Sequence, residues 1–139
     1  MKIKFCIYGE PISKGRPRMR IIKGKIPIVY TPAKTRKQEE AFITQAMPFK
    51  PEKPLVNPLS INVITFFSIP ASFSKKQKEK AISGYLRPAK KPDIDNIVKS
   101  ILDSMNKIFY QDDKQVVEMS VKKFYSEAPR TEIEIVELE

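Results

Sequence analysis

The sequence contains no histidine, and this absence excludes several reaction classes. Without an imidazole there can be no serine or cysteine triad, no zinc site built on histidine and no histidine-dependent ββα nuclease. Any chemistry must therefore use carboxylates, lysine, tyrosine or water on a metal ion.

Cysteine is scarce, and long apolar runs are missing. The single cysteine, Cys6, cannot form an internal disulfide and lies in an alternating strand pattern, where a small buried residue is expected. No run is long enough to span a membrane, no lipid-anchor motif is present, and the N-terminus does not have the pattern of a signal peptide. We therefore expect an intracellular, cytoplasmic protein that does not act at a membrane.

Acidic residues are outnumbered, and the excess of positive charge is uneven. Twenty-six Lys and Arg against sixteen Asp and Glu give a net charge of +10. Residues 1–38 hold eleven of the basic residues and one acid, Glu10. Such a balance predicts a polyanionic partner, with nucleic acid as the first candidate. The candidates for contact with the DNA backbone are Lys14, Arg16, Arg18 and Arg20, with Lys75 to Lys80, Lys90 and Lys91 as weaker ones. A solvated, solubilising loop is the alternative for the first four.

The length and the periodicity predict one α+β domain over residues 1–139, with a mixed β-sheet packed against a few helices. Alternating or β-branched stretches predict strands, and apolar spacing with capping residues predicts helices. The expected strands cover residues 2–9, 59–70, 115–125 and 131–138, and the expected helices cover 31–47, 72–83 and 93–106. A short basic hairpin is expected to turn near Gly24.

The most informative segment runs from Lys90 to Met119. Asp93 lies where a helix N-cap would, and Asp95 and Asn96 fall in the first turn. Lys99 follows Asp95 by one turn, so the two side chains are expected to be neighbours. An apolar stripe at helical spacing is expected to face the core; it consists of Ile94, Ile97, Val98, Ile101, Leu102 and Met105.

A second acidic pair, Asp112 and Asp113, follows this helix in a turn before a strand. If the turn folds back beside the first turn of the helix, Asp113 meets Asp93 and Asp95. Three carboxylates in one site would repel each other unless a cation with a preference for oxygen ligands, such as Mg²⁺ or Mn²⁺, lies between them. In a basic chain that binds a polyanion, the acids suggest such a cation.

Each part of this segment also has a simpler interpretation. Asp93 alone could be a cap, Asp95 and Lys99 alone could be a helix ion pair, and Asp112 and Asp113 could be turn residues. The combination is less easily explained this way, because a cap needs neither a second acid nor a third acidic cluster after the same helix.

The segment resembles the RusA-type Holliday junction resolvases, which are metal-dependent endodeoxyribonucleases common in prophages. The resemblance is carried by Asp93-Ile-Asp95-Asn96, Lys99, Asp103, and Asp112-Asp113 followed by Gln115-Val116-Val117. It covers about the last third of the chain closely and extends loosely into the closing strand.

This resemblance implies that Asp93, Asp95 and Asp113 are catalytic acids that bind Mg²⁺, with Mn²⁺ as a substitute, and that Lys99 is an essential lysine. Asn96 and Asp112 match the motif as neighbours that orient the site. It also implies a homodimer that cuts four-way junctions or related branched DNA by phosphodiester hydrolysis, in recombination and repair. No small-molecule organic cofactor is expected.

Two other functions fit parts of the sequence. Pro92-Asp93 with Asp112-Asp113-Lys114 satisfies the loose PD-(D/E)xK pattern of restriction-like nucleases, which would make Lys114 essential. The second possible function is that of a basic DNA-binding module without catalysis. Stacking of bases on Phe66, Phe67, Phe109 or Tyr110 is not expected, because apolar residues at such positions are usually core.

Overall fold

The computed structural model describes residues 1–12, 18–21, 24, 26–30 and 33–139, and it contains a four-stranded mixed sheet covered by helices. The sheet order is β1-β6-β4-β5, and only the pair β4 and β5 is parallel. Its strands are β1 (Lys2–Tyr8), β4 (Leu59–Ser68), β5 (Val116–Ser126) and β6 (Arg130–Glu137). These strands confirm the four expected from alternation and β-branched composition.

The helices are also those that spacing and capping predict. They are α1 (Ala33–Ala46), α2 (Lys75–Ile82) and α3 (Ile94–Met105), with single 3₁₀ turns η1 (Met47–Phe49) and η2 (Asp113–Gln115). Ser74 begins α2 with a capping box, since its hydroxyl accepts from the Gln77 amide at 3.2 Å and the Gln77 side chain accepts from the Ser74 amide. The α+β prediction is therefore confirmed.

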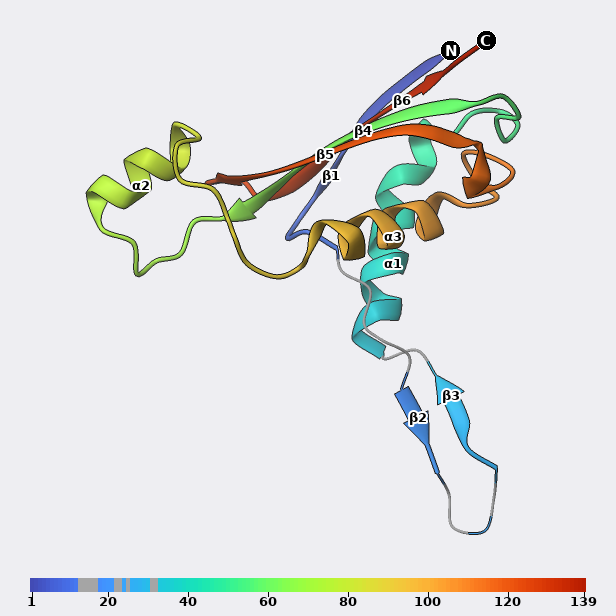
Figure 1. The fold of residues 1–139 in the computed structure, drawn as a ribbon, viewed down its shortest axis with the longest axis horizontal. Helices are drawn as coiled ribbons and strands as arrows, with labels where there is room; N and C mark the ends of the chain where they lie inside the picture. The colour runs from blue at the N-terminus through green and yellow to red at the C-terminus, as the bar shows by residue number, and fades with distance from the viewer. Residues whose placement is uncertain (13–17, 22–23, 25, 31–32) are drawn as a thin grey trace.

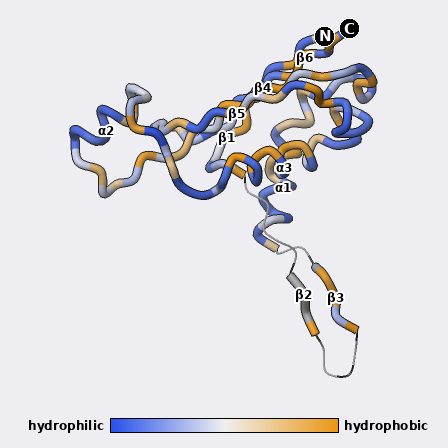
Figure 2. The backbone as a smooth tube through the Cα atoms, viewed as in Figure 1, coloured by the Kyte–Doolittle hydropathy of each residue, from blue (hydrophilic) through white to orange (hydrophobic). Residues whose placement is uncertain are grey.

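Helices α1 and α3 lie on one face of the sheet, and α2 lies near one end of it (Figure 1). In the same view, β2 (Arg18–Arg20) and β3 (Ile28–Tyr30) form the expected hairpin, away from the sheet. Figure 2 shows hydrophobic residues along α3 and hydrophilic ones along α2 and the segment leading into α3. Within the described ranges, no helix has both the length and the apolar character needed to cross a bilayer.

The core lies between the helices and the sheet. Ile97, Ile101 and Met105 of α3 are fully buried, as are Ile61 and Val63 of β4. Each such side chain contributes about 1.5–3 kcal/mol by leaving water, so α3 is firmly held along one side.

Two expectations about burial were wrong. Ile94, Val98 and Leu102 were expected in the core with the rest of their stripe, but Ile94 is 46% exposed and the other two are half-buried. The reason is that these three lie along one ridge of α3, at steps of four, beside the fully buried ridge of Ile97, Ile101 and Met105. Cys6 is half-buried rather than buried, because it alternates with the buried Phe5 and Ile7 and lies on the other face of β1.

Candidate active site

The first turn of α3 presents two carboxylates to solvent. Asp93 has the extended backbone of an N-cap residue, yet its side chain makes no capping hydrogen bond. Asp95 follows in the first turn, and both residues are exposed. A purely capping role for Asp93 would require a bond to an amide of that turn, so the geometry favours another use of this carboxylate.

Lys99 is exposed one turn after Asp95. In the described part of the chain, no ion pair within 4.0 Å joins these two residues, so the helix ion pair that their spacing allows is not formed. Both groups are available to a ligand at this end of the helix. Asn96, beside them, is half-buried, and its carbonyl accepts from the Ser100 hydroxyl at 2.9 Å.

The second acidic pair begins the 3₁₀ turn η2. The Asp112 carboxylate accepts from the Lys114 amide at 2.9 Å, and the Gln115 side chain accepts from the Asp112 amide at 2.9 Å. The bond from the Lys114 amide is the main reason that the pKa of Asp112 is lower than usual. Asp112 therefore shapes the turn, and its neighbour Asp113 is exposed.

Asp113 lies at the opposite end of α3 from Asp93. The Tyr110 hydroxyl donates to the carbonyl of Leu102, near the end of α3, at 2.6 Å. Burial raises the pKa of Tyr110, and the charges of Asp113, Asp103 and Asp112 raise it further, which places Asp113 near this end. The chain leaves α3 where β5 begins, and β5 then runs back toward the start of α3 (Figure 1).

A twelve-residue helix is about 18 Å long. The expectation that Asp113 folds back beside Asp93 and Asp95 within one chain is therefore wrong. Across residues 1–12, 18–21, 24, 26–30 and 33–139, no three acidic or thiol side chains are grouped closely enough to hold a metal ion. The physical reason is that η2 directly precedes β5, which runs antiparallel to α3.

Substitution of Tyr110 by phenylalanine tests the contact that joins η2 to α3. Loss of the hydrogen bond to Leu102 should lower the free energy of unfolding by about 1 kcal/mol at pH 7. Because the pKa of Tyr110 is raised in the folded chain, this tyrosine's contribution is complete below the unfolded pKa of about 10 and declines above it. Urea unfolding of both proteins from pH 7 to 11 should show the difference shrinking above pH 10. A constant difference would contradict this account.

A basic residue that the sequence did not single out lies at the start of α3. The Lys123 ammonium donates to the carbonyls of Lys90 and Pro92, the latter at 3.0 Å. Its pKa is lowered by burial, while the charge of Asp93 opposes the shift. Lys123 thus fixes the segment that carries Asp93. The sequence signal for this position is alternation, because Lys123 lies two residues from both Val121 and Tyr125, on the side of β5 that packs against the core.

The basic candidates for DNA contact are only partly described. Lys14 and Arg16 lie outside the described residues, and Arg18 and Arg20 are described only as backbone positions in β2. Lys91 is exposed two residues before Asp93. Their roles stay predictions.

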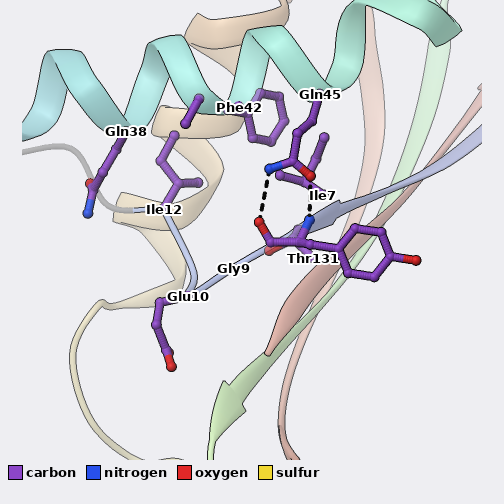
Figure 3. Close-up of a pocket in the computed structure, with 10 residues that line it drawn as sticks. Ile7, Gly9, Glu10, Ile12, Gln38, Phe42, Gln45 and Thr131 are labelled. Atoms are coloured by element: carbon purple, nitrogen blue, oxygen red, sulfur yellow. Dashed lines mark hydrogen bonds between the residues drawn. The ribbon is translucent and has the colours of Figure 1, made fainter. Parts of the chain in front are cut away.

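A pocket of about 250 Å³ lies where β1 ends beside α1 (Figure 3). Ile7, Ile12 and Phe42 form its apolar lining, with Glu10 and Gln38 toward its rim. The Gln45 amide group bridges the backbone of Tyr8, accepting from its N–H at 2.8 Å and donating to its carbonyl at 3.0 Å. Gln45 thereby fixes the point from which the chain leaves β1 toward the basic segment.

Comparison with known proteins identifies the family of this chain. The family model described as Endodeoxyribonuclease RusA matches residues 8–136. The chain is 45% identical over 138 residues to "Uncharacterized protein YqaN" of Bacillus subtilis (strain 168), covering 98% of this chain and 96% of that protein. It is 30% identical over 140 residues to "Crossover junction endodeoxyribonuclease rusA" of Lactococcus phage r1t, covering 99% of this chain and 98% of the phage protein. By the extent of both kinds of match, the chain belongs to the RusA family of endodeoxyribonucleases.

Proposed function

We propose that this protein is a Mg²⁺-dependent endodeoxyribonuclease that cuts four-way junctions and related branched DNA as a homodimer. The observation that carries the proposal is the exposed pair Asp93 and Asp95 at the start of α3, with no capping bond to occupy Asp93. Acids placed this way in a chain of net charge +10 would weaken DNA binding unless a cation accompanied them. A role in recombination and repair follows from such a substrate.

The separation of Asp113 from Asp93 and Asp95 supports the dimer. If two copies of α3 pair antiparallel about a two-fold axis, the end of one helix lies beside the start of the other. Asp113 of the partner subunit would then complete the site. Such pairing needs an apolar contact, and α3 offers a ridge at steps of four: Ile94 is exposed, and Val98 and Leu102 are half-buried.

In this dimer the residues of the chain have separate tasks. Asp93 and Asp95, with Asp113 of the partner subunit, would hold one or two Mg²⁺ ions through carboxylate oxygens, the ligands that this ion prefers. When bound, the ion lowers the pKa of water and offsets charge that develops on the phosphate. Lys99, one turn from Asp95, would place its ammonium against a phosphate oxygen and stabilise the transition state. Two symmetric sites would supply the two opposed cuts that a junction requires.

The restriction-like alternative is less well supported by the geometry. The PD-(D/E)xK pattern normally places its acids on adjacent strands, whereas Asp93 precedes a helix and Asp113 and Lys114 lie in η2. A DNA-binding module without catalysis would leave the exposed pair Asp93 and Asp95 without a use.

The proposal is tested by measuring how fast a synthetic four-way junction is cut, in Mg²⁺ and in chelator. The parent is compared with variants of Lys99 and Lys114. The parent should cut in Mg²⁺ only. Lys99→Ala should cut at least about 100-fold more slowly, because one transition-state donor is lost. Lys114→Ala should stay within about threefold, because its bond to Asp112 uses the backbone amide. The reverse order would favour the restriction-like reading, and binding without cutting in any condition would leave only the DNA-binding module.

A further inference from the structure

The face of the sheet opposite α1 and α3 carries an ordered row of aromatic and arginine side chains. Tyr8 pairs with Arg130 across β1 and β6, Arg130 with Phe66 across β6 and β4, and Phe66 with Phe124 across β4 and β5. Thr65 and Phe67, on either side of Phe66, are buried, so Phe66 points to the other face. Figure 1 shows helices α1 and α3 on the opposite side of these strands.

The arginine and phenylalanine side chains of this row are stacked on one another. The Arg130 guanidinium lies 4.0 Å from the centre of the Phe66 ring, and the Arg87 guanidinium lies 3.7 Å from that of Phe124. The two rings are 6.0 Å apart with an interplanar angle of 29°. We call Tyr8, Arg130, Phe66, Phe124 and Arg87 the arginine–aromatic stripe. Tyr8 is 68% exposed, and both phenylalanines are half-buried.

The two guanidinium groups are held in place before any ligand arrives. Arg130 donates to Glu132 at 3.2 Å, to the Ser126 hydroxyl at 3.1 Å and to the Ala128 carbonyl at 2.9 Å. Arg87 donates to the Lys123 carbonyl at 2.6 Å. Planar groups fixed in this way lose little freedom when a further flat group stacks on them.

The stripe lies at the same end of the sheet as the exposed acids. Arg87 lies over Phe124, on the face of the sheet opposite α1 and α3. From there the chain passes around the edge strand β5 and reaches Asp93 six residues later. On the way, the carbonyls of Lys90 and Pro92 accept from Lys123, which faces the helices. The turn at Gly84 borders the stripe, since a Cβ there would lie 3.6 Å from the Phe124 ring.

We propose that the arginine–aromatic stripe stacks unpaired bases of single-stranded DNA. Aromatic rings and arginine planes on an open sheet are a known means of binding bases that have left a duplex, and such stacking tolerates any base. The assignment of these bases to the branch point of a junction rests on the proposed nuclease function.

The chemistry of this face favours DNA over a second copy of the chain. Next to the stripe the face is polar and charged, with Lys4, Asn62 and Lys122 among its residues. Of the acids on this face, Glu132 and Glu134 are paired with Arg130 at 3.2 Å and with Lys2 at 3.5 Å, and Glu118 lies at the start of β5, at the end of the sheet away from the stripe. The centre of a stable protein interface is depleted of charge, whereas paired acids and flat cations are compatible with a nucleic acid strand.

The test compares the affinity of the parent and of the double variant Phe66→Leu/Phe124→Leu for two fluorescent ligands in the presence of chelator. One ligand is an oligo(dT) strand, and the other is a duplex of equal length. Leucine keeps the positions apolar but removes the stacking planes. We expect the double variant to bind oligo(dT) at least about tenfold more weakly and the duplex within about twofold of the parent. The salt dependence should not change, because no charge is removed. Equal affinity of variant and parent for oligo(dT), or an equal loss on both DNAs, would overturn the proposal.

Two further variants keep the result interpretable. Phe49→Leu is the matched control, because Phe49 is 46% exposed and stacks on Phe5 at 5.6 Å, away from the stripe; its binding should equal that of the parent. Arg87→Lys keeps the charge and removes one stacking plane, so it should weaken oligo(dT) binding severalfold even if the double variant does not fold. A change in sedimentation with unchanged oligo(dT) binding would assign the face to protein contact and sink the proposal.

Failure here is distinguishable from failure of the nuclease proposal. If the parent cuts a junction in Mg²⁺ but its binding of oligo(dT) does not depend on Phe66 and Phe124, only the proposal for the stripe is contradicted. If binding of oligo(dT) depends on the stripe but the protein cuts in no condition, only the nuclease proposal is contradicted.

Discussion

Asp95→Asn is expected to lower Mg²⁺-dependent cutting of a four-way junction at least about 1,000-fold while leaving junction binding equal to or tighter than that of the parent. A thousandfold loss corresponds to about 4 kcal/mol of transition-state stabilisation, which is the scale expected when a cation loses a carboxylate ligand. Binding is retained because the change removes one negative charge from the surface that faces DNA. Single-turnover cutting and a gel-shift titration measure the two effects.

The matched control for Asp95→Asn is Glu79→Gln, which removes one charge from an exposed acid of α2. It should cut within about twofold of the parent, since only the net charge changes. If Asp95→Asn cuts as fast as the parent, Asp95 does not belong to the site, and the metal proposal loses its central residue.

Mixing two inactive variants is expected to restore activity. In a dimer whose sites combine Asp95 of one subunit with Asp113 of the other, a heterodimer of Asp95→Asn and Asp113→Asn has one site with both changes and one with neither. Random pairing of equal amounts makes half of the dimers mixed, so about a quarter of all sites should work. Each variant alone should be almost inactive.

The products of the mixture carry a second signature. A mixed dimer has one working site, so it should nick junctions without making paired opposed cuts. Co-expression with two affinity tags, followed by sequential purification, gives the pure mixed dimer. Absence of any recovered nicking in that preparation would show that the three acids do not meet across a two-fold axis. Co-expressed parent with Asp95→Asn controls for the purification and should also nick.

The secondary structure could be predicted closely because local signals agreed with the packing. Ser74 precedes α2 with glutamine three residues later, and the alternation in β6 matches its burial. The amphipathic stripe of α3 correctly placed Ile97, Ile101 and Met105 in the core. In these elements, spacing alone decides which side chains face inward.

The arrangement of the acids could not be predicted from local signals. The sequence shows that acidic pairs flank one helix, but the ends of a twelve-residue helix are about 18 Å apart. The end of α3 at which Asp113 lies depends on the parallel pairing of β4 with β5. This pairing joins residues more than fifty positions apart in the sequence. The half-buried position of Phe66 depends in the same way on which face of the sheet the helices cover, so its place outside the core could not be predicted from local signals.

On both edge strands of the sheet, side chains form hydrogen bonds with backbone groups. Gln45 bonds the N–H and carbonyl of Tyr8 on β1, and Arg87 bonds the carbonyl of Lys123 on β5. A strand from another molecule would have to displace these bonds before it could add to either edge strand there. At these two points the bonds therefore oppose edge-to-edge growth of the sheet into an open filament.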